Sequence, residues 1–167
     1  AAQNSVTALK NAQKMGLYGS EMDVWLTKDG YLVVGHDKKM NGLSFQDTDY
    51  DLLKDMKLSN GEKLPQLKDF LVQLKQSESP TKLFIEIKKH DSFERNMTVV
   101  KAVLDTVRYY KVENKVQYIT FNLDICKELV RIDPEAVVAC LKGGMAPAEV
   151  YEMGIRGIHY HRKEYRD

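Results

Sequence analysis

Apolar strand-like runs and helical patterns alternate along the second half of the sequence, and this alternation restricts the chain to an α/β fold. Strand-like runs at 82–88, 116–121, 136–141 and 155–160 are separated by helical patterns at 93–110, 123–132 and 147–153. Short connections in such an order make the strands parallel, with the helices packed against the sheet. A doubly wound sheet and a TIM barrel share this order. Lys142-Gly143-Gly144 is isolated and no glycine-rich phosphate loop follows any strand, which favours the barrel.

The first half of the chain predicts two helices around a pair of strands. Ser5 is a suitable N-cap for a helix through about residue 15, and Pro65 begins a helix through about residue 75. Between them, 19–25 and 31–34 form apolar strands joined by the turn residues Lys28-Asp29-Gly30. A short helix is expected at 49–56.

Composition limits the class of protein. At 167 residues, with 43% hydrophobic and 29% charged side chains, the whole chain, 1–167, is expected to form one domain. A net charge of +1 gives no basic field to recruit nucleic acid, and no apolar run is long enough for stable membrane insertion. Cys126 and Cys140 are expected to be free buried thiols. The start at Ala1 without methionine suggests processing or trimming, so a cytoplasmic or a periplasmic or secreted location stays open, with the latter preferred.

Acidic residues occupy strand positions that normally carry valine. Glu21 and Asp23 share one face of the first strand, because side chains alternate along an extended chain. Glu86 interrupts the apolar strand 82–88, and Lys88 lies two residues further on the same face. Lys88 alone could form a structural ion pair with Glu86, but one lysine cannot neutralise three carboxylates. Oxygen ligands of this kind select Mg²⁺ or Ca²⁺, so we expect a divalent cation at Glu21, Asp23 and Glu86.

Of the four histidines, His36 is the candidate proton-transfer group. His36 ends the return strand near the acids, and its imidazole could accept or donate a proton near pH 7. His90 follows two lysines and is expected to be solvated. His159 and His161 share one face of the last predicted strand, where they either line a pocket or lie exposed.

These residues resemble the motifs of the glycerophosphodiester phosphodiesterase family. Residues 21–30, EMDVWLTKDG, followed by 33–37, VVGHD, are similar to the family pattern E-x-D-V-x-x-T-x-D-G and V-V-x-H-D. Residues 61–67 resemble its G-E-x-I-P-T-L segment, and 84–88 resemble its N-I-E-I-K strand. Gln3-Asn4-Ser5 stands where the family has E-N-T.

The resemblance implies an α/β fold, a TIM (β/α)8-type barrel of which this chain covers roughly strands two to six. It implies hydrolysis of glycerophosphodiesters to glycerol phosphate and an alcohol, with a small-molecule substrate and a divalent cation, Mg²⁺ or Ca²⁺. By position, Glu21, Asp23 and Glu86 resemble the metal ligands, His36 an acid/base histidine, and Lys88 a cation for the substrate phosphate.

The family pattern extends beyond both ends of this sequence. Its H-R-G motif, with a second histidine, would precede Asn4, and roughly two further β/α units would follow the last strand. We therefore expect a fragment of a longer polypeptide, or a partner that supplies the missing part. Open sheet edges make oligomers possible, and this stretch alone should bind metal weakly and hydrolyse little.

Two other functions are weighed against the phosphodiesterase. A non-catalytic phosphodiester-binding or interaction module would keep the acidic site without the first histidine. A metal-dependent enolising barrel would use Lys88 as its base, but the spacing of Glu21, Asp23 and His36 argues against it.

Overall fold

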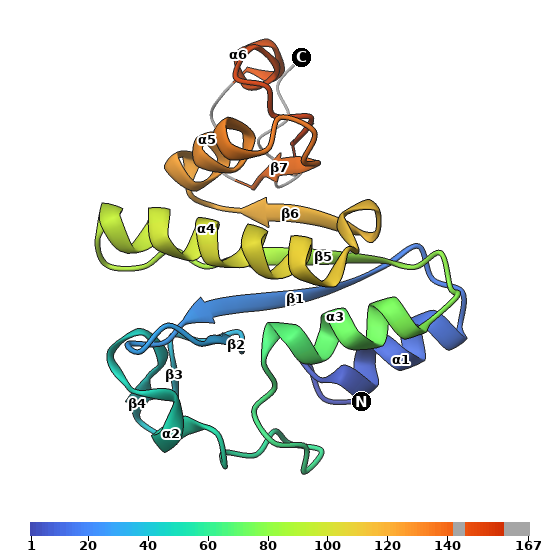
Figure 1. The fold of residues 1–167 in the computed structure, drawn as a ribbon, viewed down its shortest axis with the longest axis vertical. Helices are drawn as coiled ribbons and strands as arrows, with labels where there is room; N and C mark the ends of the chain where they lie inside the picture. The colour runs from blue at the N-terminus through green and yellow to red at the C-terminus, as the bar shows by residue number, and fades with distance from the viewer. Residues whose placement is uncertain (142–145, 159–167) are drawn as a thin grey trace.

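The computed structural model describes residues 1–141 and 146–158, which form one open, twisted sheet with helices packed on it (Figure 1). The sheet has six strands in the order β2-β1-β5-β6-β7-β8. The parallel strands are β1 (Gly19–Leu26), β5 (Lys82–Ile87), β6 (Val116–Thr120), β7 (Val138–Cys140) and β8 (Gly157–Ile158). Strand β2 (Leu32–Val34) runs antiparallel to β1 at one edge. This is the α/β architecture that the alternating sequence pattern predicts.

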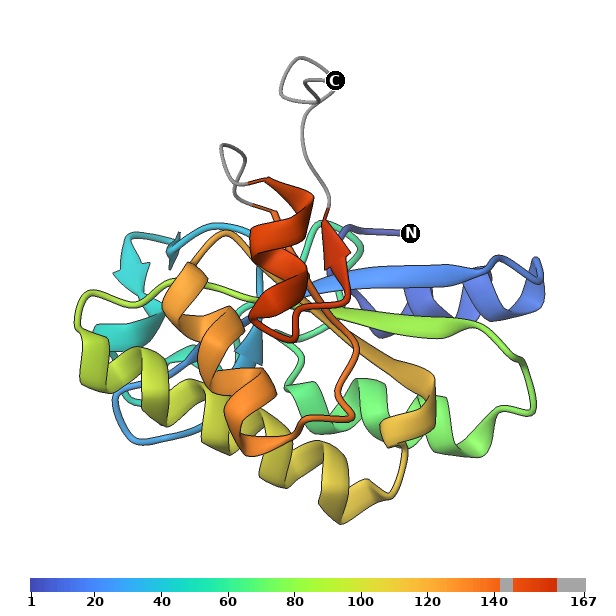
Figure 2. The same ribbon diagram turned by 90° about the horizontal axis from the view of Figure 1, so that it is seen from above.

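The helices pack against a single face of the sheet, as Figure 2 shows for α3, α4 and α5. The principal helices are α1 (Val6–Lys14), α3 (Leu67–Gln76), α4 (Phe93–Tyr110), α5 (Leu123–Ile132) and α6 (Pro147–Glu152). Their buried side chains join those of the strands in one apolar core. Local signals explain the helix starts, since the hydroxyl oxygens of Ser5 and Ser92 accept backbone N–H bonds in the first turns of α1 and α4.

Strand alternation divides each central strand between the helical core and the opposite face of the sheet. On β1, Met22 and Val24 are fully buried under the helices, and on β5 Ile85 is buried in the same way. The intervening residues, Asp23 and Glu86, therefore face away from the helices. In a barrel this opposite face is the interior, and it carries the acidic side chains here.

A smaller core covers the end of β1. It contains Trp25, Val33, Phe45, Leu53 and Leu64. The segment between β2 and α3 provides most of it and includes the short strands β3 (Lys39–Met40) and β4 (Leu43–Ser44) and the single-turn helix α2 (Tyr50–Leu53). The sequence placed a longer helix at 49–56 and gave no sign of the β3-β4 hairpin. Both errors arise because elements of two to four residues are too short to carry a period.

Longer elements agree closely with the sequence pattern. Helices α4 and α5 have the predicted bounds, and the predicted strands are right in place and type but two or more residues too long at 136–141 and 155–160. Residues 159 and 160 of that last predicted strand lie outside the described residues. Among the described residues, no helix has both the length and the apolar character needed to cross a membrane.

The core of α3 provides a test of this packing. Phe70 is 1% exposed, and Phe70→Ala should lower the free energy of unfolding by about 3–5 kcal/mol, as expected for a buried aromatic side chain. Urea unfolding followed by circular dichroism measures the loss. Val72→Ala on the exposed side of the same helix is the matched control and should cost about 0.5 kcal/mol or less. Equal losses in both variants would contradict the described orientation of α3.

Candidate active site

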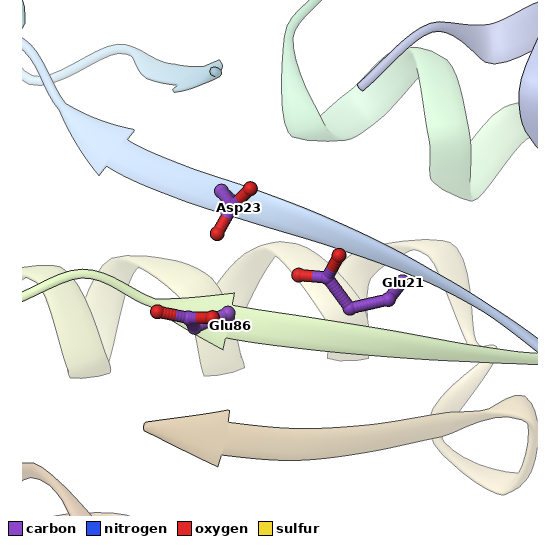
Figure 3. A group of neighbouring side chains, drawn as sticks. All are labelled: Glu21, Asp23 and Glu86. Carbon is purple, nitrogen blue, oxygen red and sulfur yellow. The ribbon is translucent and has the colours of Figure 1, made fainter. Parts of the chain in front are cut away.

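Three carboxylates from two neighbouring parallel strands converge on the face away from the helices (Figure 3). Asp23 on β1 lies directly opposite Glu86 on β5 in the strand register, and Glu21 lies two residues before Asp23. One oxygen from each carboxylate can be chosen so that all three atoms lie within 4.8 Å of one another. The period of two and the parallel register therefore bring these residues together as the sequence predicts.

Lys88 neutralises two of the three carboxylates. Its Nζ lies 2.7 Å from Asp23 Oδ1 and 2.7 Å from Glu86 Oε1. Both acidic residues are largely shielded, with Asp23 2% and Glu86 9% exposed. The structural ion pair considered for Glu86 is thus present and extends to Asp23. Glu21 has no such partner among the described residues, so the cluster keeps an uncompensated acid.

The pKa values of Glu21, Glu86 and Lys88 are all raised within this cluster. Partial burial, and then the charges of Asp23 and Glu86, raise the pKa of Glu21 from 4.5 to about 7. Burial also raises the pKa of Glu86, although Lys88 opposes the shift. Burial acts to lower the pKa of Lys88, but its bonds to the two carboxylates outweigh it and raise the value. Near neutral pH, Glu21 is the member of the cluster that most readily exchanges a proton.

Asn4 holds the Asp23 carboxylate in place, and the sequence did not single it out. Its Nδ2 donates to Asp23 Oδ2 at 2.8 Å, and its Oδ1 accepts the backbone N–H of Asp23 at 2.9 Å. Asn4 adopts a left-handed backbone with φ of 58°, which asparagine tolerates better than most residues. The only signal in the sequence was the position of Gln3-Asn4-Ser5 at the family's E-N-T motif.

His36 lies near Glu21, and its charge acts to lower the pKa of that carboxyl. It follows β2, its side chain is 60% exposed, and its Nδ1 lies 2.8 Å from Asp37 Oδ1. When Nδ1 donates to Asp37, Nε2 is the nitrogen left to exchange a proton. His36 lines a cavity of about 150 Å³ that Asn4, Lys39 and Met40 also line. Within the described chain, none of the three carboxylates lines this cavity. Asn4 connects the two, because it lines the cavity and also donates a hydrogen bond to Asp23.

The other histidines require one correction. His90 is 1% exposed, so the prediction of a solvated side chain is wrong. Its Nε2 accepts the backbone N–H of Leu26 at 3.0 Å, and its Nδ1 lies 3.0 Å from the carbonyl oxygen of Lys88. His159 and His161 lie outside the described residues.

The donor set fits a hard divalent cation. It consists of carboxylate oxygens, which suit Mg²⁺ and Ca²⁺ better than zinc, and no sulfur or imidazole ligand belongs to the cluster within the described chain. Its position near the carboxyl ends of β1 and β5 is where TIM barrels carry their active sites. Fold and site together define a protein of the TIM-barrel class with an acidic site at the strand ends.

The chain belongs to the glycerophosphoryl diester phosphodiesterase family, whose model matches residues 1–156. The protein YqiK of Bacillus subtilis is 30% identical over 174 residues, which cover 96% of this chain and 70% of YqiK. A glycerophosphodiester phosphodiesterase of Caldanaerobacter subterraneus is 29% identical over 161 residues, and the matched region is 83% of this chain but 60% of that relative. The family predicted from the motifs is confirmed.

The fold of this chain is also that of a solved glycerophosphodiester phosphodiesterase structure. The crystal structure of a glycerophosphodiester phosphodiesterase from Parabacteroides distasonis superimposes with a TM-score of 0.95 and 43% sequence identity. The superposition covers 98% of this chain and 68% of that one. The described sheet is therefore part of a TIM barrel, as predicted.

The raised pKa of Glu21 predicts a pH effect on metal-free protein. Its folded value of about 7 exceeds the unfolded value of 4.5, so the folded state binds the proton more tightly between these values. The resulting stabilisation is present below the unfolded pKa and is lost as pH rises through 7. In EDTA, the free energy of unfolding should fall from about pH 5 to pH 7 relative to Glu21→Gln, then level off.

Urea unfolding at a series of pH values tests this expectation. Glu78→Gln, an exposed glutamate between α3 and β5, is the matched control and should follow the wild-type pH curve. Identical pH curves for wild type and Glu21→Gln would contradict the expectation.

Proposed function

We propose that the protein carrying this chain hydrolyses glycerophosphodiesters, with the help of a divalent cation, to glycerol phosphate and an alcohol. The observation that carries the proposal is the convergence of Glu21, Asp23 and Glu86 within 4.8 Å at the strand ends of a family-typical barrel. The matched region is about 60–70% of its relatives, so the proposal concerns the protein as its gene encodes it.

Glu21, Asp23 and Glu86 would hold the cation, Mg²⁺ or Ca²⁺. Bound there, it would supply charge withdrawal from the non-bridging oxygens of the phosphodiester. Asn4 donates one hydrogen bond to the Asp23 carboxylate and accepts another from the Asp23 backbone N–H, which limits the reorganisation needed for binding. Glu21 must lose its proton to act as a ligand, because a protonated carboxyl is a poor one.

Lys88 supplies a positive charge next to the site. Its ammonium already bridges Asp23 and Glu86, so it balances part of the cluster's charge and fixes the two carboxylates side by side. With a cation held by those carboxylates, the same ammonium would supply a positive charge for an anionic phosphate group. This role for Lys88 follows from its position and from the family motif.

His36 transfers the proton. An alkoxide is a poor leaving group and needs a proton from a positioned acid as the bond to phosphorus breaks. Asp37 at 2.8 Å orients the imidazole through Nδ1 and leaves Nε2 to exchange the proton. The small cavity beside His36 gives the substrate a surface to rest against.

The role of His36 predicts a selective loss. His36→Ala should lower kcat for glycerophosphocholine by roughly 10²- to 10⁴-fold, the usual worth of acid–base catalysis. The loss should be smaller with bis(p-nitrophenyl) phosphate, whose leaving group needs no proton. Divalent affinity, measured by calorimetry, should stay close to wild type. Wild-type turnover of both substrates would remove His36 from the mechanism.

Metal removal provides the second test. EDTA should abolish turnover, and Mg²⁺ or Ca²⁺ added in excess should restore it. Glu86→Gln should weaken divalent binding by about 10-fold or more through loss of a charged ligand, with Glu78→Gln as the matched control. Full activity in EDTA would contradict metal dependence. Binding of glycerophosphocholine without turnover by the wild-type protein would instead identify a non-catalytic phosphodiester-binding module.

A further inference from the structure

His90 joins the ends of the two strands that carry the acidic cluster. Its ring lies between Leu26, the last residue of β1, and Lys88, just after β5. Nε2 accepts from the Leu26 N–H, which leaves Nδ1 to donate to the Lys88 carbonyl, so these partners assign the neutral tautomer with the proton on Nδ1. Its backbone N–H donates to Asn96 Oδ1 on α4. Burial lowers the pKa of His90, which favours the neutral ring that these hydrogen bonds require.

Trp25 extends this connection toward His36. The Trp25 and His90 rings are 5.2 Å apart at an interplanar angle of 62°, an edge-to-face contact. On its other side, the Trp25 Nε1–H donates to the carbonyl oxygen of Gly35 at 3.0 Å. Gly35 immediately precedes His36, so one continuous set of contacts runs from the end of β5 to the residue before the histidine.

Gly35 is held from three directions. Besides the bond from Trp25, its N–H donates to the carbonyl oxygen of Asp23 at 3.0 Å. A Cβ on Gly35 would lie 2.8 Å from the buried ring of Phe45, so a larger residue here would have to displace that ring. The backbone that enters His36 is thus fixed against β1 by two hydrogen bonds and a close aromatic contact.

A polar contact holds the segment on the far side of His36. We call residues 35–38 the His36 arm. Lys38 Nζ lies 2.7 Å from Asp91 Oδ2, and the Asp91 N–H donates to Gln46 Oε1 at 3.1 Å. This ion pair is largely exposed and contributes little by itself. The buried connection through Trp25 and His90 is therefore the stronger of the two attachments.

We propose that Trp25 and His90 are positioning residues for His36, which hold the His36 arm at the distance from the acidic cluster that proton transfer requires. The inference rests on the proposed function. Neither residue touches the carboxylate oxygens or the His36 ring in the described contacts, so both act through the Gly35 backbone. Small displacements of a catalytic group are costly, and about 1 Å can lower the rate roughly 10²-fold.

Trp25→Phe is the sharpest test, because it keeps an aromatic ring beside His90 while it removes the donor to Gly35 together with part of the buried ring. With glycerophosphocholine, kcat should fall by about 10- to 100-fold, whereas KM and Mg²⁺ affinity should change by about threefold or less. The loss should be smaller with bis(p-nitrophenyl) phosphate, since misplacing His36 affects protonation of the leaving group. Thr81→Val is the matched control. It removes a partly buried hydrogen bond to the Leu17 carbonyl at the opposite end of the sheet and should leave kcat unchanged.

A double-mutant cycle separates positioning from general destabilisation. If Trp25 acts through His36, Trp25→Phe should lower kcat by less than about threefold in a His36→Ala background. An equal factor in both backgrounds would overturn the inference. A second pair of variants changes His90. His90→Leu removes the acceptor for the Leu26 N–H and should lower kcat, whereas His90→Gln keeps an acceptor and should retain most of the wild-type kcat.

Thermal unfolding of each variant checks that the losses in kcat are measured on folded protein. If Trp25→Phe does not fold, the two His90 variants test the positioning role in its place. Retention of wild-type kcat by Trp25→Phe or by His90→Leu would overturn the positioning role alone. Absence of turnover in the wild-type protein would overturn the proposed function, and this inference with it.

Discussion

Three carboxylates face one ammonium group on adjoining parallel strands, and this imbalance of charge governs the site. The register that sets Asp23 opposite Glu86 leaves room for Lys88 to bridge that pair but not to reach every acid at once. The excess charge appears as the raised pKa of Glu21. Such a cluster is stabilised either by a bound proton or by a bound cation. Because the two compete for the same negative charge, binding of a cation depends on pH.

Two parts of the site are held by different forces. The carboxylates project from central strands, whose positions are set by backbone hydrogen bonds and by the apolar core beneath them. His36 lies outside the sheet, and its position depends on its chain neighbours. Gly35 is held by Trp25 and lies next to Phe45, and Lys38 pairs with Asp91. Substitutions in the small core around Trp25 can therefore displace the histidine while the acidic cluster remains intact.

Much of this could be predicted from residue patterns, for identifiable reasons. The period of two placed Glu21 and Asp23 on one face, and the long apolar stripes of α4 and α5 gave their bounds. The burial of His90 could not be predicted, because Lys88-Lys89-His90 has the composition of an exposed loop. The imidazole is held in the interior by its contact with the Trp25 ring and by its hydrogen bonds to the Leu26 and Lys88 backbone. The bond from Asn4 to Asp23 spans 19 positions, and no local pattern encodes it.

Trp25 is the single tryptophan of the chain, and it lies within the connection between the two parts of the site. Indole emission shifts with the polarity of its surroundings and is quenched when a neighbouring imidazole becomes protonated. Within this chain, emission excited at wavelengths that tyrosine does not absorb therefore arises from one buried indole in contact with His90. The molecule carries its own optical reporter, which can be followed without a label, a substrate or a bound cation.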